Sequence, residues 1–590
     1  MLKLTKYFKW WYYPLIIFIV ALIYIQIEFD LRLIDKVADI IRSIGIADTT
    51  GTPQTKEILS IGLSMVLITL VSISTTILAS FLASRIGANL SKNLRKQLYL
   101  KVDGFSLEEI NQFSTSSLIT RTSNDIQQVQ MVMIILLRMA ITAPMMAIRG
   151  VLKISGLSSE LSIITAIGVI FILTVISVIF VFVTPKFKVM QEQNDELNLV
   201  TRENLVGLRV VRAHNAQEIE KDKFENINER ITRLNLFVNR GMQLLMPNMA
   251  LAMNGVSLAI VWLAAVLINQ GNLGQNGYDG IAIQTQFTTY SMQILISFMM
   301  LTMLFIMIPR GQVSAKRIRE VLNTKTKIKD PVNPKTINKE EAIHIKFEDV
   351  CFKYPNAEEC VIENVNFEAN MGQTVAFIGS TGSGKSTIIN LIPRFYDVTH
   401  GSIKINDIDI RDLKQTDLID LVGYVPQKGM LFQGDIQSNL RLGNEHATDE
   451  ELLSALEISQ SKDFVMALED NLNAPVSQGG KNFSGGQRQR LCIARTIVKQ
   501  PKIYIFDDSF SALDYQTDRK LRRELEKTTK NAIKLIVAQR ISTILHADQI
   551  VVLENGKIVG KGTHKELLKT NHVYQEMAYS QLSEEELAHE

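Results

Sequence analysis

Six long apolar segments in the first half of the chain constrain its fold more than any other feature. Each has the roughly 20 residues that a helix rising about 1.5 Å per residue needs to cross a bilayer. Apolar residues make up 46% of the 590-residue chain, and they crowd into this half. The pattern predicts six membrane-spanning helices followed by a soluble part. The expected spans are Trp11–Phe29, Leu59–Ser84, Met131–Leu152, Leu161–Thr184, Leu244–Asn269 and Phe287–Ile308.

Basic residues beside the spans indicate which side of the membrane each loop faces. Lys3, Lys6 and Lys9 precede the first span, and the long loops after the second and fourth spans are rich in Lys and Arg. The short loops after the third and fifth spans carry none, and only Arg149 and Lys153 run against the trend. The positive-inside rule therefore predicts that both termini and both long loops are cytoplasmic. A cleavable signal peptide is the competing interpretation of the first segment, but no small-residue cleavage site follows it.

Net charge and cysteine spacing exclude other classes of protein. The formal charge is only +3 and there is no Lys/Arg block, so we expect no nucleic acid partner. Cys351, Cys360 and Cys492 have neither disulfide-type nor zinc-type spacing, which fits a reducing compartment. Arg138, inside the third span, has two open interpretations. It either marks a substrate path or extends its charged head to the cytoplasmic interface.

The sequence changes character after the sixth span. Asn323–Glu341 is rich in Lys, Thr, Asn and Pro, as linkers are. From Ile343 onward, short β-type runs alternate with helical stretches, a pattern that predicts an α/β domain. We therefore expect a membrane domain over residues 1–322, a linker over 323–342 and a soluble domain over 343–590.

A phosphate-binding loop follows the β-type run Thr374–Ile378, and a helical pattern begins near Thr387. Its glycines allow backbone N–H groups to surround phosphates at a helix N-terminus, where the helix dipole favours negative charge. Lys385 is expected to reach the β- and γ-phosphates of ATP, and the Ser386 hydroxyl to hold Mg²⁺. The predicted ATP-binding residues here are Gly379, Ser380, Thr381, Gly382, Ser383, Gly384, Lys385 and Ser386 of the loop, together with Thr387.

A second acidic position supports the same site. Ile503–Asp507 is an apolar strand that ends in a carboxylate, which suits it to orient Mg²⁺ through water. A buried strand that ends in a surface aspartate is the plainer interpretation. The two motifs together favour a nucleotide site.

Further motifs resemble those of ABC transporters. Phe483–Gln487 resembles the signature motif of that family, and Arg488–Arg490 continues it. Tyr354 matches the aromatic residue that stacks on adenine, and Gln427 matches the Gln-loop residue that contacts Mg²⁺. Their order, together with six preceding spans, resembles the exporter subclass across nearly the whole chain. The signature residues are Ser484, Gly485, Gly486 and Gln487, and the D-loop residues are Ser511, Ala512, Leu513 and Asp514.

The resemblance implies a membrane all-α domain of six transmembrane helices with long cytoplasmic extensions, joined to a cytoplasmic α/β P-loop ATPase domain. It also implies a head-to-tail dimer, with each ATP held between the phosphate loop of one subunit and the signature motif of the other. Ser116–Asn124 and Arg202–Ala213 resemble the two coupling regions of such exporters. With one ATPase domain and six spans, the chain would be half of a transporter.

Two departures from the family pattern affect the chemistry. Asp508 stands where active members have the glutamate that serves as general base, and it is shorter by one methylene. A general base needs hydrogen-bond reach, and its retreat by a bond length can cost about a hundredfold in rate. Gln539 replaces a histidine that contacts the γ-phosphate, and an amide cannot carry positive charge. Beside an intact phosphate loop, these changes resemble the degenerate-site subunit of heterodimeric bacterial exporters.

The leading hypothesis is ATP-driven efflux of hydrophobic or amphiphilic compounds across the bacterial cytoplasmic membrane, with a second half-transporter as partner. The chain's own site would bind ATP but hydrolyse it poorly, and its signature motif would complete the partner's site. One alternative is a homodimeric exporter of lipid or peptide with Asp508 as a slow base. Another is a regulatory or sensing membrane protein without transport. Cargo has no recognition motif, because such cavities are built from scattered apolar side chains.

Overall fold

The computed structural model describes residues 10–50, 52–338, 340–355 and 357–581. Lys3, Lys6 and Lys9 therefore lie outside the described residues. The described chain forms two packed units. The helical unit comprises the residues up to Asp103 together with Thr115–Thr324. The sheet unit comprises Gly104–Ser114 and the residues from Lys325 onward.

Long helices make up the helical unit. Every predicted span overlaps one of them, and within the described residues six helices are long and apolar enough to cross a membrane. The prediction of six membrane helices is thereby confirmed. These helices are α1 (Tyr12–Thr50), α2 (Thr55–Asp103), α5 (Ile126–Ser155), α6 (Ser159–Val206), α9 (Leu245–Asn269) and α10 (Gly277–Asn323).

Several of these helices are much longer than a bilayer is thick. Helices α2, α6 and α10 contain 49, 48 and 47 residues. At about 1.5 Å per residue each extends about 70 Å, more than twice the hydrocarbon thickness of about 30 Å. The predicted extensions beyond the membrane are therefore continuous helix. Shorter elements lie at their ends: α4 (Thr115–Thr120), a π-helical turn (Arg121–Asp125), α7 (Leu208–Ala213) and α8 (Gln217–Gln243), which leads into α9.

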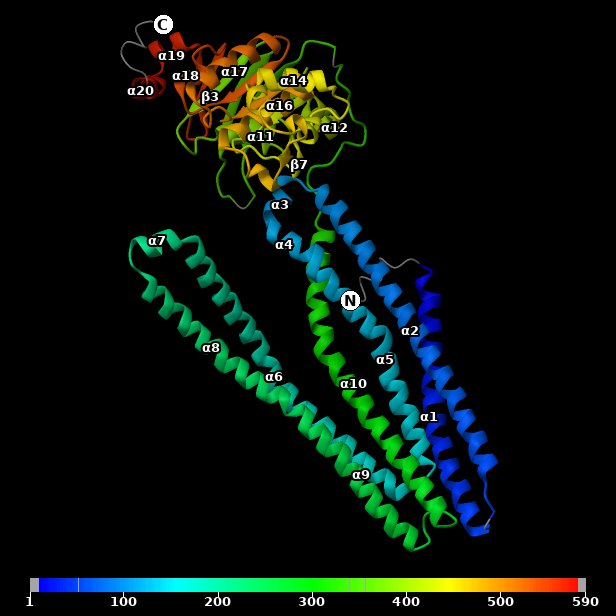
Figure 1. Ribbon diagram of the computed structural model, residues 1–590. Helices are drawn as coiled ribbons and strands as arrows, with labels where there is room; N and C mark the ends of the chain where they lie inside the picture. Colours follow the sequence, from blue (N-terminus) through cyan, green and yellow to red (C-terminus); the bar gives the residue numbers. More distant parts are fainter. Residues whose placement is uncertain (1–9, 51, 339, 356, 582–590) are drawn as a thin grey trace. The chain divides into compact units, whose positions relative to one another are not determined.

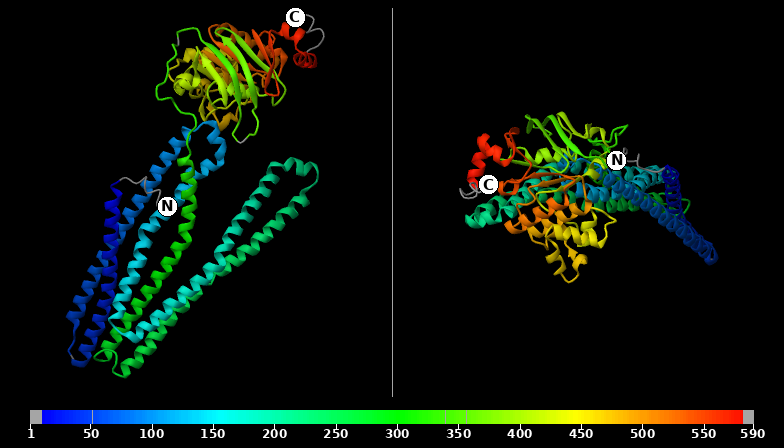
Figure 2. Two further views of the ribbon diagram at one scale, coloured as in Figure 1. Left: turned by 180° about the vertical axis from the view of Figure 1, so that it is seen from behind. Right: turned by 90° about the horizontal axis from the view of Figure 1, so that it is seen from above.

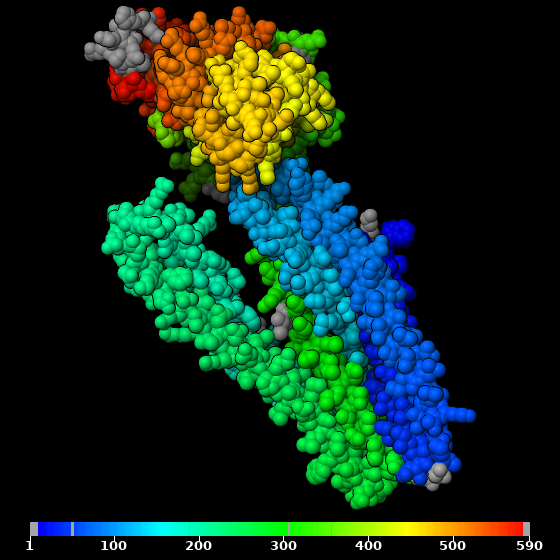
Figure 3. All heavy atoms as spheres, in the orientation of Figure 1, coloured from blue at the N-terminus to red at the C-terminus, as the bar shows by residue number. Residues whose placement is uncertain are grey.

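The helices of this unit form two groups. Helices α1, α2, α5 and α10 pack along one another, whereas α6 packs with α8 and α9 as an arm (Figure 1). The arm contacts α10 through α9 and α6, and it diverges from α10 toward α7. The space-filling view shows open space between this end of the arm and the other group (Figure 3).

A polar cluster joins α1, α5 and α10. The Asp35 carboxylate accepts hydrogen bonds from Lys153 Nζ at 2.7 Å and from Gln286 Nε2 at 2.9 Å, and also from the Tyr290 hydroxyl. In the same region Arg149 pairs with Glu28. Lys153 and Arg149 are the two basic residues that run against the charge trend of the loops. Each is neutralised by an acid on α1, so neither contradicts the orientation that the loops predict.

Replacing Asp35 with alanine should destabilise the helical unit. The change leaves Lys153 and two polar donors without their common acceptor, at an expected cost of about 1–3 kcal/mol. Thermal melting of the purified chain in lipid nanodiscs measures the effect. Glu218→Ala is the control, because the Lys221–Glu218 pair is 71% and 81% exposed and should contribute little. Equal melting temperatures for the two variants would contradict this account.

The sheet unit is built on a six-stranded sheet with the order β12-β11-β3-β10-β9-β6. All neighbouring pairs are parallel except β11 with β12. The predicted strands Thr374–Ile378 and Ile503–Asp507 are confirmed as β3 and β9. The strand bounds are β3 (Thr374–Gly379), β6 (Val422–Val425), β9 (Ile503–Asp507), β10 (Ile533–Val537), β11 (Gln549–Glu554) and β12 (Lys557–Gly562).

A second, antiparallel sheet has the order β2-β1-β4-β5 and faces the viewer in the left view of Figure 2. The expected run from Ile343 to Phe347 is the start of its central strand β1, which continues to Phe352. One hydrophobic core lies between this sheet and the parallel sheet, and another surrounds α14 and α16. The bounds are β1 (His344–Phe352), β2 (Ile362–Asn370), β4 (His400–Ile405) and β5 (Ile408–Asp409), with β7 (Gly434–Asp435) and β8 (Pro475–Val476) forming a separate pair.

Helices cover the strands of this unit. Their order along the chain alternates with the strands, as the sequence predicts for an α/β domain. The fold class is therefore confirmed for both parts of the chain. The helices are α11 (Lys385–Leu391), α12 (Gln415–Leu421), α13 (Ile436–Arg441), α14 (Asp449–Ile458), α15 (Lys462–Met466), α16 (Gly485–Lys499), α17 (Tyr515–Thr528), α18 (Ile541–Ile544), α19 (His564–Thr570) and α20 (His572–Gln581).

A short helix between α2 and α4, α3 (Leu107–Phe113), belongs to the sheet unit. Leu107 packs against the core between the two sheets, and Asn111 Nδ2 donates a hydrogen bond to the Tyr396 hydroxyl at 3.3 Å. The buried Glu109 carboxylate accepts the backbone N–H of Lys327 at 3.0 Å. The segment seated on the sheet unit is thus α3, whereas the expected coupling region Ser116–Asn124 lies in the helical unit. A role for Ser116–Asn124 in coupling stays a prediction.

The expected linker is also fastened to the sheet unit. Lys335 pairs with Asp412 at 2.8 Å, and Asp330 Oδ1 accepts the backbone N–H of Gln415 at 2.8 Å. Ile328 is buried in the same segment. The described residues between α10 and β1 therefore follow the surface of the unit along a fixed path.

Glu109→Ala should loosen α3. Burial alone would raise the pKa of Glu109, but hydrogen bonds from Ser106 and from the Lys327 amide hold it below its ordinary value. A carboxylate with a lowered pKa contributes its full stability at neutral pH, and that contribution fades only as the pH falls through the folded-state pKa. We expect a loss of about 2–3 kcal/mol, measured by thermal melting. A melting temperature equal to that of Glu225→Ala, an exposed control on α8, would contradict the assignment.

Candidate functional site

The predicted phosphate loop connects β3 to α11. Gly382 and Gly384 have φ angles of +85° and +94°, a region that side chains rarely adopt. A Cβ atom on Gly384 would also lie 2.7 Å from Cγ2 of Ile362. Glycine is therefore required at this position both by backbone conformation and by space.

Lys385 lies at the start of α11 with its ammonium group folded back across the loop. Its Nζ donates to the carbonyl oxygens of Gly379 at 2.9 Å and Ser380 at 2.7 Å. Burial lowers the pKa of Lys385 below its ordinary value, although the carboxylates of Asp508 and Asp507 oppose the shift. A buried ammonium in a loop of backbone groups suits phosphate oxygens, which can replace the two carbonyls.

Ser386 and Asp507 meet although they lie on different elements. The Ser386 hydroxyl donates to Asp507 Oδ1 at 2.8 Å, and the Tyr424 hydroxyl lies 3.3 Å from Asp507 Oδ2. Burial raises the pKa of Asp507, against the effect of these hydrogen bonds. A hydroxyl oxygen and a carboxylate oxygen converge here. These are the oxygen ligands that Mg²⁺ prefers when phosphates complete its coordination. The residues present thus fit the metal.

Asp508, which follows β9, is buried and adopts a φ of +47°. Aspartate is among the few residues that tolerate this left-handed conformation. Its Oδ2 accepts a hydrogen bond from Gln427 Nε2 at 3.0 Å, and its backbone N–H donates to the Val537 carbonyl at 3.0 Å. The structure therefore brings the predicted Gln427 and Asp508 together beside Asp507.

Tyr354 lies next to the phosphate loop. Its hydroxyl is 3.2 Å from Thr387 Oγ1, and its ring meets the ring of Tyr396 edge to face at 5.4 Å. These contacts fix the ring near the first turn of α11. This placement is compatible with the expected stacking of adenine on Tyr354.

The signature motif and the D-loop pack against each other. Ser484 caps α16, because its hydroxyl accepts the Gln487 N–H at 3.2 Å while Gln487 Oε1 accepts the Ser484 N–H at 2.9 Å. A Cβ atom on Gly486 would lie 3.2 Å from the Ala512 carbonyl oxygen in the D-loop. The Ser511 hydroxyl in turn donates to the Asp508 carbonyl at 2.8 Å. The D-loop thereby links the signature helix to Asp508.

Gln539 lies on the segment after β10. Its side chain is exposed, and its backbone carbonyl accepts a hydrogen bond from Gln581 Nε2 at 3.0 Å. In the D-loop, Leu513 is buried, and Asp514 caps α17 by accepting the Thr517 N–H at 3.0 Å. Within the described residues, no hydrogen bond joins Gln539 to the phosphate loop.

Tyr424 is a site residue that the sequence analysis missed. Besides its contact with Asp507, its hydroxyl donates to Asn390 Oδ1 at 3.0 Å, which ties strand β6 to α11. Burial raises its pKa, so the phenol stays protonated and donates at neutral pH. Tyr424 stands three residues before the predicted Gln427, and this proximity was the only available signal.

Comparison with known proteins agrees with this geometry. Residues 362–511 match the family described as ABC transporter, and residues 15–308 match the ABC transporter transmembrane region. An uncharacterised ABC transporter ATP-binding protein of Mycobacterium tuberculosis is 37% identical over 480 residues, which is 81% of either chain. The chain belongs to the ABC transporter family. It is a multi-pass membrane protein whose ATPase domain, the sheet unit, binds ATP and powers transport.

Other relatives extend the comparison. An uncharacterised ABC transporter ATP-binding protein of Bacillus subtilis is 32% identical over 89% of this chain and 90% of its own. A protein of Staphylococcus aureus, named as a multidrug export ATP-binding/permease protein, is 42% identical over 233 residues, or 40% of either chain. The structure of a bacterial Atm1-family ABC exporter with ATP bound superposes with a TM-score of 0.78. It is 23% identical and covers 96% of this chain and 98% of its own, so the transporter has the exporter fold.

Asp507→Asn should leave the stability of the ATP-free transporter nearly unchanged while it weakens the stabilisation by ATP and Mg²⁺. Because burial raises the pKa of Asp507, ionisation is penalised in the folded state at neutral pH, and an amide avoids that penalty. We expect unchanged or slightly higher stability without nucleotide, and loss of most of the stabilisation that ATP with Mg²⁺ adds. The stability difference without nucleotide should vanish as the pH falls toward the ordinary pKa of aspartate.

Thermal melting with and without ATP and Mg²⁺ measures both effects. Asp470→Asn, on an exposed loop, is the control and should change neither. If Asp507→Asn melts well below the parent chain without nucleotide, or keeps its full stabilisation by ATP, the assignment of Asp507 is wrong.

Proposed function

We propose that the transporter is one half of a heterodimeric exporter in which its own phosphate loop binds ATP but hydrolyses it poorly. The observation that carries the proposal is the state of Asp508. This short carboxylate follows Asp507 directly, and its Oδ2 is engaged by Gln427 at 3.0 Å. A general base must reach the attacking water within about 2.6–3.2 Å. The carboxylate reaches less far than a glutamate and already shares its charge with an amide.

Gln539 adds to this defect. Its amide can donate a hydrogen bond to a phosphate oxygen, but it supplies no positive charge to the developing transition state. The binding residues are intact by comparison. In this proposal Lys385 and the loop backbone hold the phosphates, Tyr354 stacks on adenine, and Ser386, Gln427 and Asp507 hold Mg²⁺. The metal would neutralise charge on the phosphates.

The signature motif supports the other half of the proposal. Ser484 and Gln487 form reciprocal hydrogen bonds at the N-terminus of α16, so the backbone N–H groups there are held in a fixed arrangement. Such an end favours an anion because of the helix dipole. Ser484, Gly485 and Gly486 would therefore complete a hydrolytic site whose phosphate loop and general base belong to the partner subunit.

Cargo and membrane placement are parts of the same proposal. We assign hydrophobic or amphiphilic cargo, supported by the multidrug-export name of the Staphylococcus aureus relative. The charge pattern of the loops supports an orientation with both termini and the ATPase domain in the cytoplasm. Similarity to bacterial relatives supports a bacterial cytoplasmic membrane. The domain limits proposed are residues 1–322 for the membrane domain and 343–590 for the nucleotide-binding domain. The coupling regions proposed are Ser116–Asn124 and Arg202–Ala213, together with α3.

A homodimeric exporter of lipid or peptide is the second candidate. It is favoured by the burial of Asp508 and by its hydrogen bond to Gln427, because an oriented, partly desolvated carboxylate can act as a base. In that case Asp508 of each subunit would act as the general base of one ATP site, and turnover would be slow.

Paired substitutions in the co-expressed heterodimer test the proposal. Ser484→Ala should reduce both ATP turnover and efflux of a fluorescent amphiphile at least tenfold, because it disables the competent site. Asp508→Ala should reduce them less than threefold. Ser580→Ala is the control, since this exposed hydroxyl bonds only within α20. Complete loss of turnover in Asp508→Ala would refute the degenerate-site assignment and favour the homodimer.

A further inference from the structure

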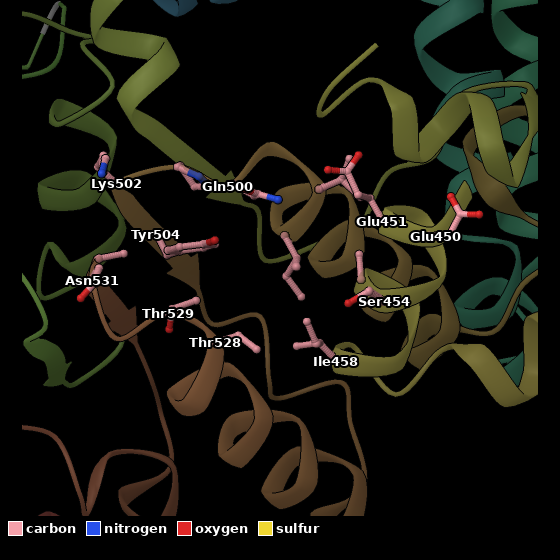
Figure 4. A pocket seen from close by; sticks show the side chains of 15 residues that line it. Glu450, Glu451, Ser454, Ile458, Gln500, Lys502, Tyr504, Thr528, Thr529 and Asn531 are labelled. Carbon is pink, nitrogen blue, oxygen red and sulfur yellow. The ribbon is translucent and has the colours of Figure 1, made fainter. Parts of the chain in front are cut away.

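The segment that carries Gln539 begins where β10 reaches the ATP site. At its start, β10 lies beside a surface depression of about 540 Å³ that Asn531 and Ala532 help to line (Figure 4). At its other end, the Val537 carbonyl accepts the N–H of Asp508 at 3.0 Å. Gln539 follows two residues later. It therefore leaves the sheet at the edge where Asp508 and the phosphate loop lie.

A side chain on α20 holds the backbone around Gln539. Gln581 Nε2 donates a hydrogen bond to the Gln539 carbonyl at 3.0 Å, and Gln581 Oε1 accepts the N–H of Ile541 at 2.9 Å. The carbonyl needs a donor and the N–H needs an acceptor, so these two partners also determine which way the amide of Gln581 points. One side chain thus fixes the backbone on both sides of Arg540.

Gln581 also caps the short helix α18. This helix has only four residues and begins at Ile541. Arg540 precedes it and is not one of the residue types that usually cap a helix N-terminus. A helix of this length is not stable by itself, because its end groups outnumber its internal hydrogen bonds. The Gln581 amide supplies the acceptor that a capping side chain would otherwise provide.

The rest of α18 is held independently of Gln581. Arg522, on α17, donates through Nη1 to the carbonyl oxygens of Ser542 at 3.2 Å and Thr543 at 2.9 Å. The buried Asp518 carboxylate accepts two hydrogen bonds from the same guanidinium, each of 2.9 Å. Loss of the Gln581 amide should therefore leave α18 attached and release mainly the backbone near Gln539.

Helix α20 is anchored firmly enough to position this amide. It packs against α18, and Tyr574 and Ala578 are buried in the same hydrophobic core as Ile541 (Figure 1). The Tyr574 hydroxyl lies 2.6 Å from Nδ1 of the buried His564. Gln581 follows Ala578 by three residues, and it therefore continues the buried face of the helix toward the segment that carries Gln539.

We propose that Gln581 is a positioning residue of the ATP site, which holds the Gln539 backbone where the Gln539 side chain reaches the γ-phosphate. The Gln539 side chain is exposed, so its reach depends on where its backbone is held. The preference of this site for a nucleoside triphosphate over a diphosphate then depends on α20. The inference rests on the γ-phosphate contact proposed for Gln539, and it applies to a heterodimer and a homodimer alike.

The nucleotide preference of the full chain in lipid nanodiscs tests this inference. Displacement of a fluorescent ADP analogue measures the dissociation constants of ADP and of β,γ-imido-ATP, which is not hydrolysed, both with Mg²⁺. Gln581→Ala should weaken binding of β,γ-imido-ATP at least threefold, the effect of about one hydrogen bond. ADP lacks the γ-phosphate, so its binding should hardly change. Equal weakening of both nucleotides would indicate a general structural defect and overturn the proposal.

Two further variants separate positioning from helix capping and from stability. Gln581→Glu keeps the acceptor for the Ile541 N–H but removes the donor to the Gln539 carbonyl, so it should lower the preference as Gln581→Ala does. Gln575→Ala is the matched control on α20, because the Gln575 amide donates to the Leu568 carbonyl at 2.7 Å instead. An unchanged preference in Gln581→Glu, or an equal loss in Gln575→Ala, would overturn the proposal.

Gln539→Ala distinguishes failure of this inference from failure of the role given to Gln539. It should lower the preference at least as much as Gln581→Ala, and the double variant should lose no more, because the two residues act in series. If only Gln539→Ala lowers the preference, Gln581 is not a positioning residue, although the role of Gln539 stands. If Gln539→Ala has no effect, the γ-phosphate contact is wrong and the inference fails with it.

Discussion

The parallel pairing of β3, β10 and β9 is the constraint on which the ATP site depends. The register places Phe377 beside Val537 and Val537 beside Asp507, so the carboxyl ends of the three strands meet at one edge of the sheet. The phosphate loop leaves β3 at that edge, and Asp507 ends β9 there. The hydrogen bond between Ser386 and Asp507 at 2.8 Å closes the site across the intervening strand. A shift in this register would separate the groups expected to hold the phosphates and the metal.

A helix from the first half of the chain packs on the same domain. Helix α3 is held through Leu107, through the Asn111–Tyr396 hydrogen bond, and through Glu109, whose carboxylate accepts the N–H of Lys327. Lys327 follows the end of α10, so one buried carboxylate fixes both α3 and the start of the segment that leads to β1. A movement of the ATPase domain would therefore carry α3 with it. In the proposed coupling, α3 would pass ATP-driven motion along the chain to α2, which directly precedes it.

Features with local signals could be predicted from the sequence. The six spans are long and largely apolar runs, β3 and β9 are short apolar runs, and the phosphate loop has a fixed glycine spacing. Features that depend on distant partners could not be predicted. Glu109 resembles any acid in a polar loop until Lys327 is placed beside it. Tyr424 and the pairing of Arg149 with Glu28 are likewise contacts between residues far apart in the sequence. The sequence reveals that Asp508 and Gln539 depart from the family pattern, but it could not show that Gln427 donates a hydrogen bond to the Asp508 carboxylate.

The central claim is that binding and hydrolysis of ATP are divided between two subunits, because Asp508 and Gln539 have weakened one site while the signature motif remains whole. ATP turnover of the purified chain in lipid nanodiscs, alone and with a co-expressed second half-transporter, tests this claim most directly. The account predicts almost no turnover for the chain alone and strong turnover for the pair. Robust turnover by the chain alone, abolished by Asp508→Asn, would show that Asp508 is a competent base and would contradict the account.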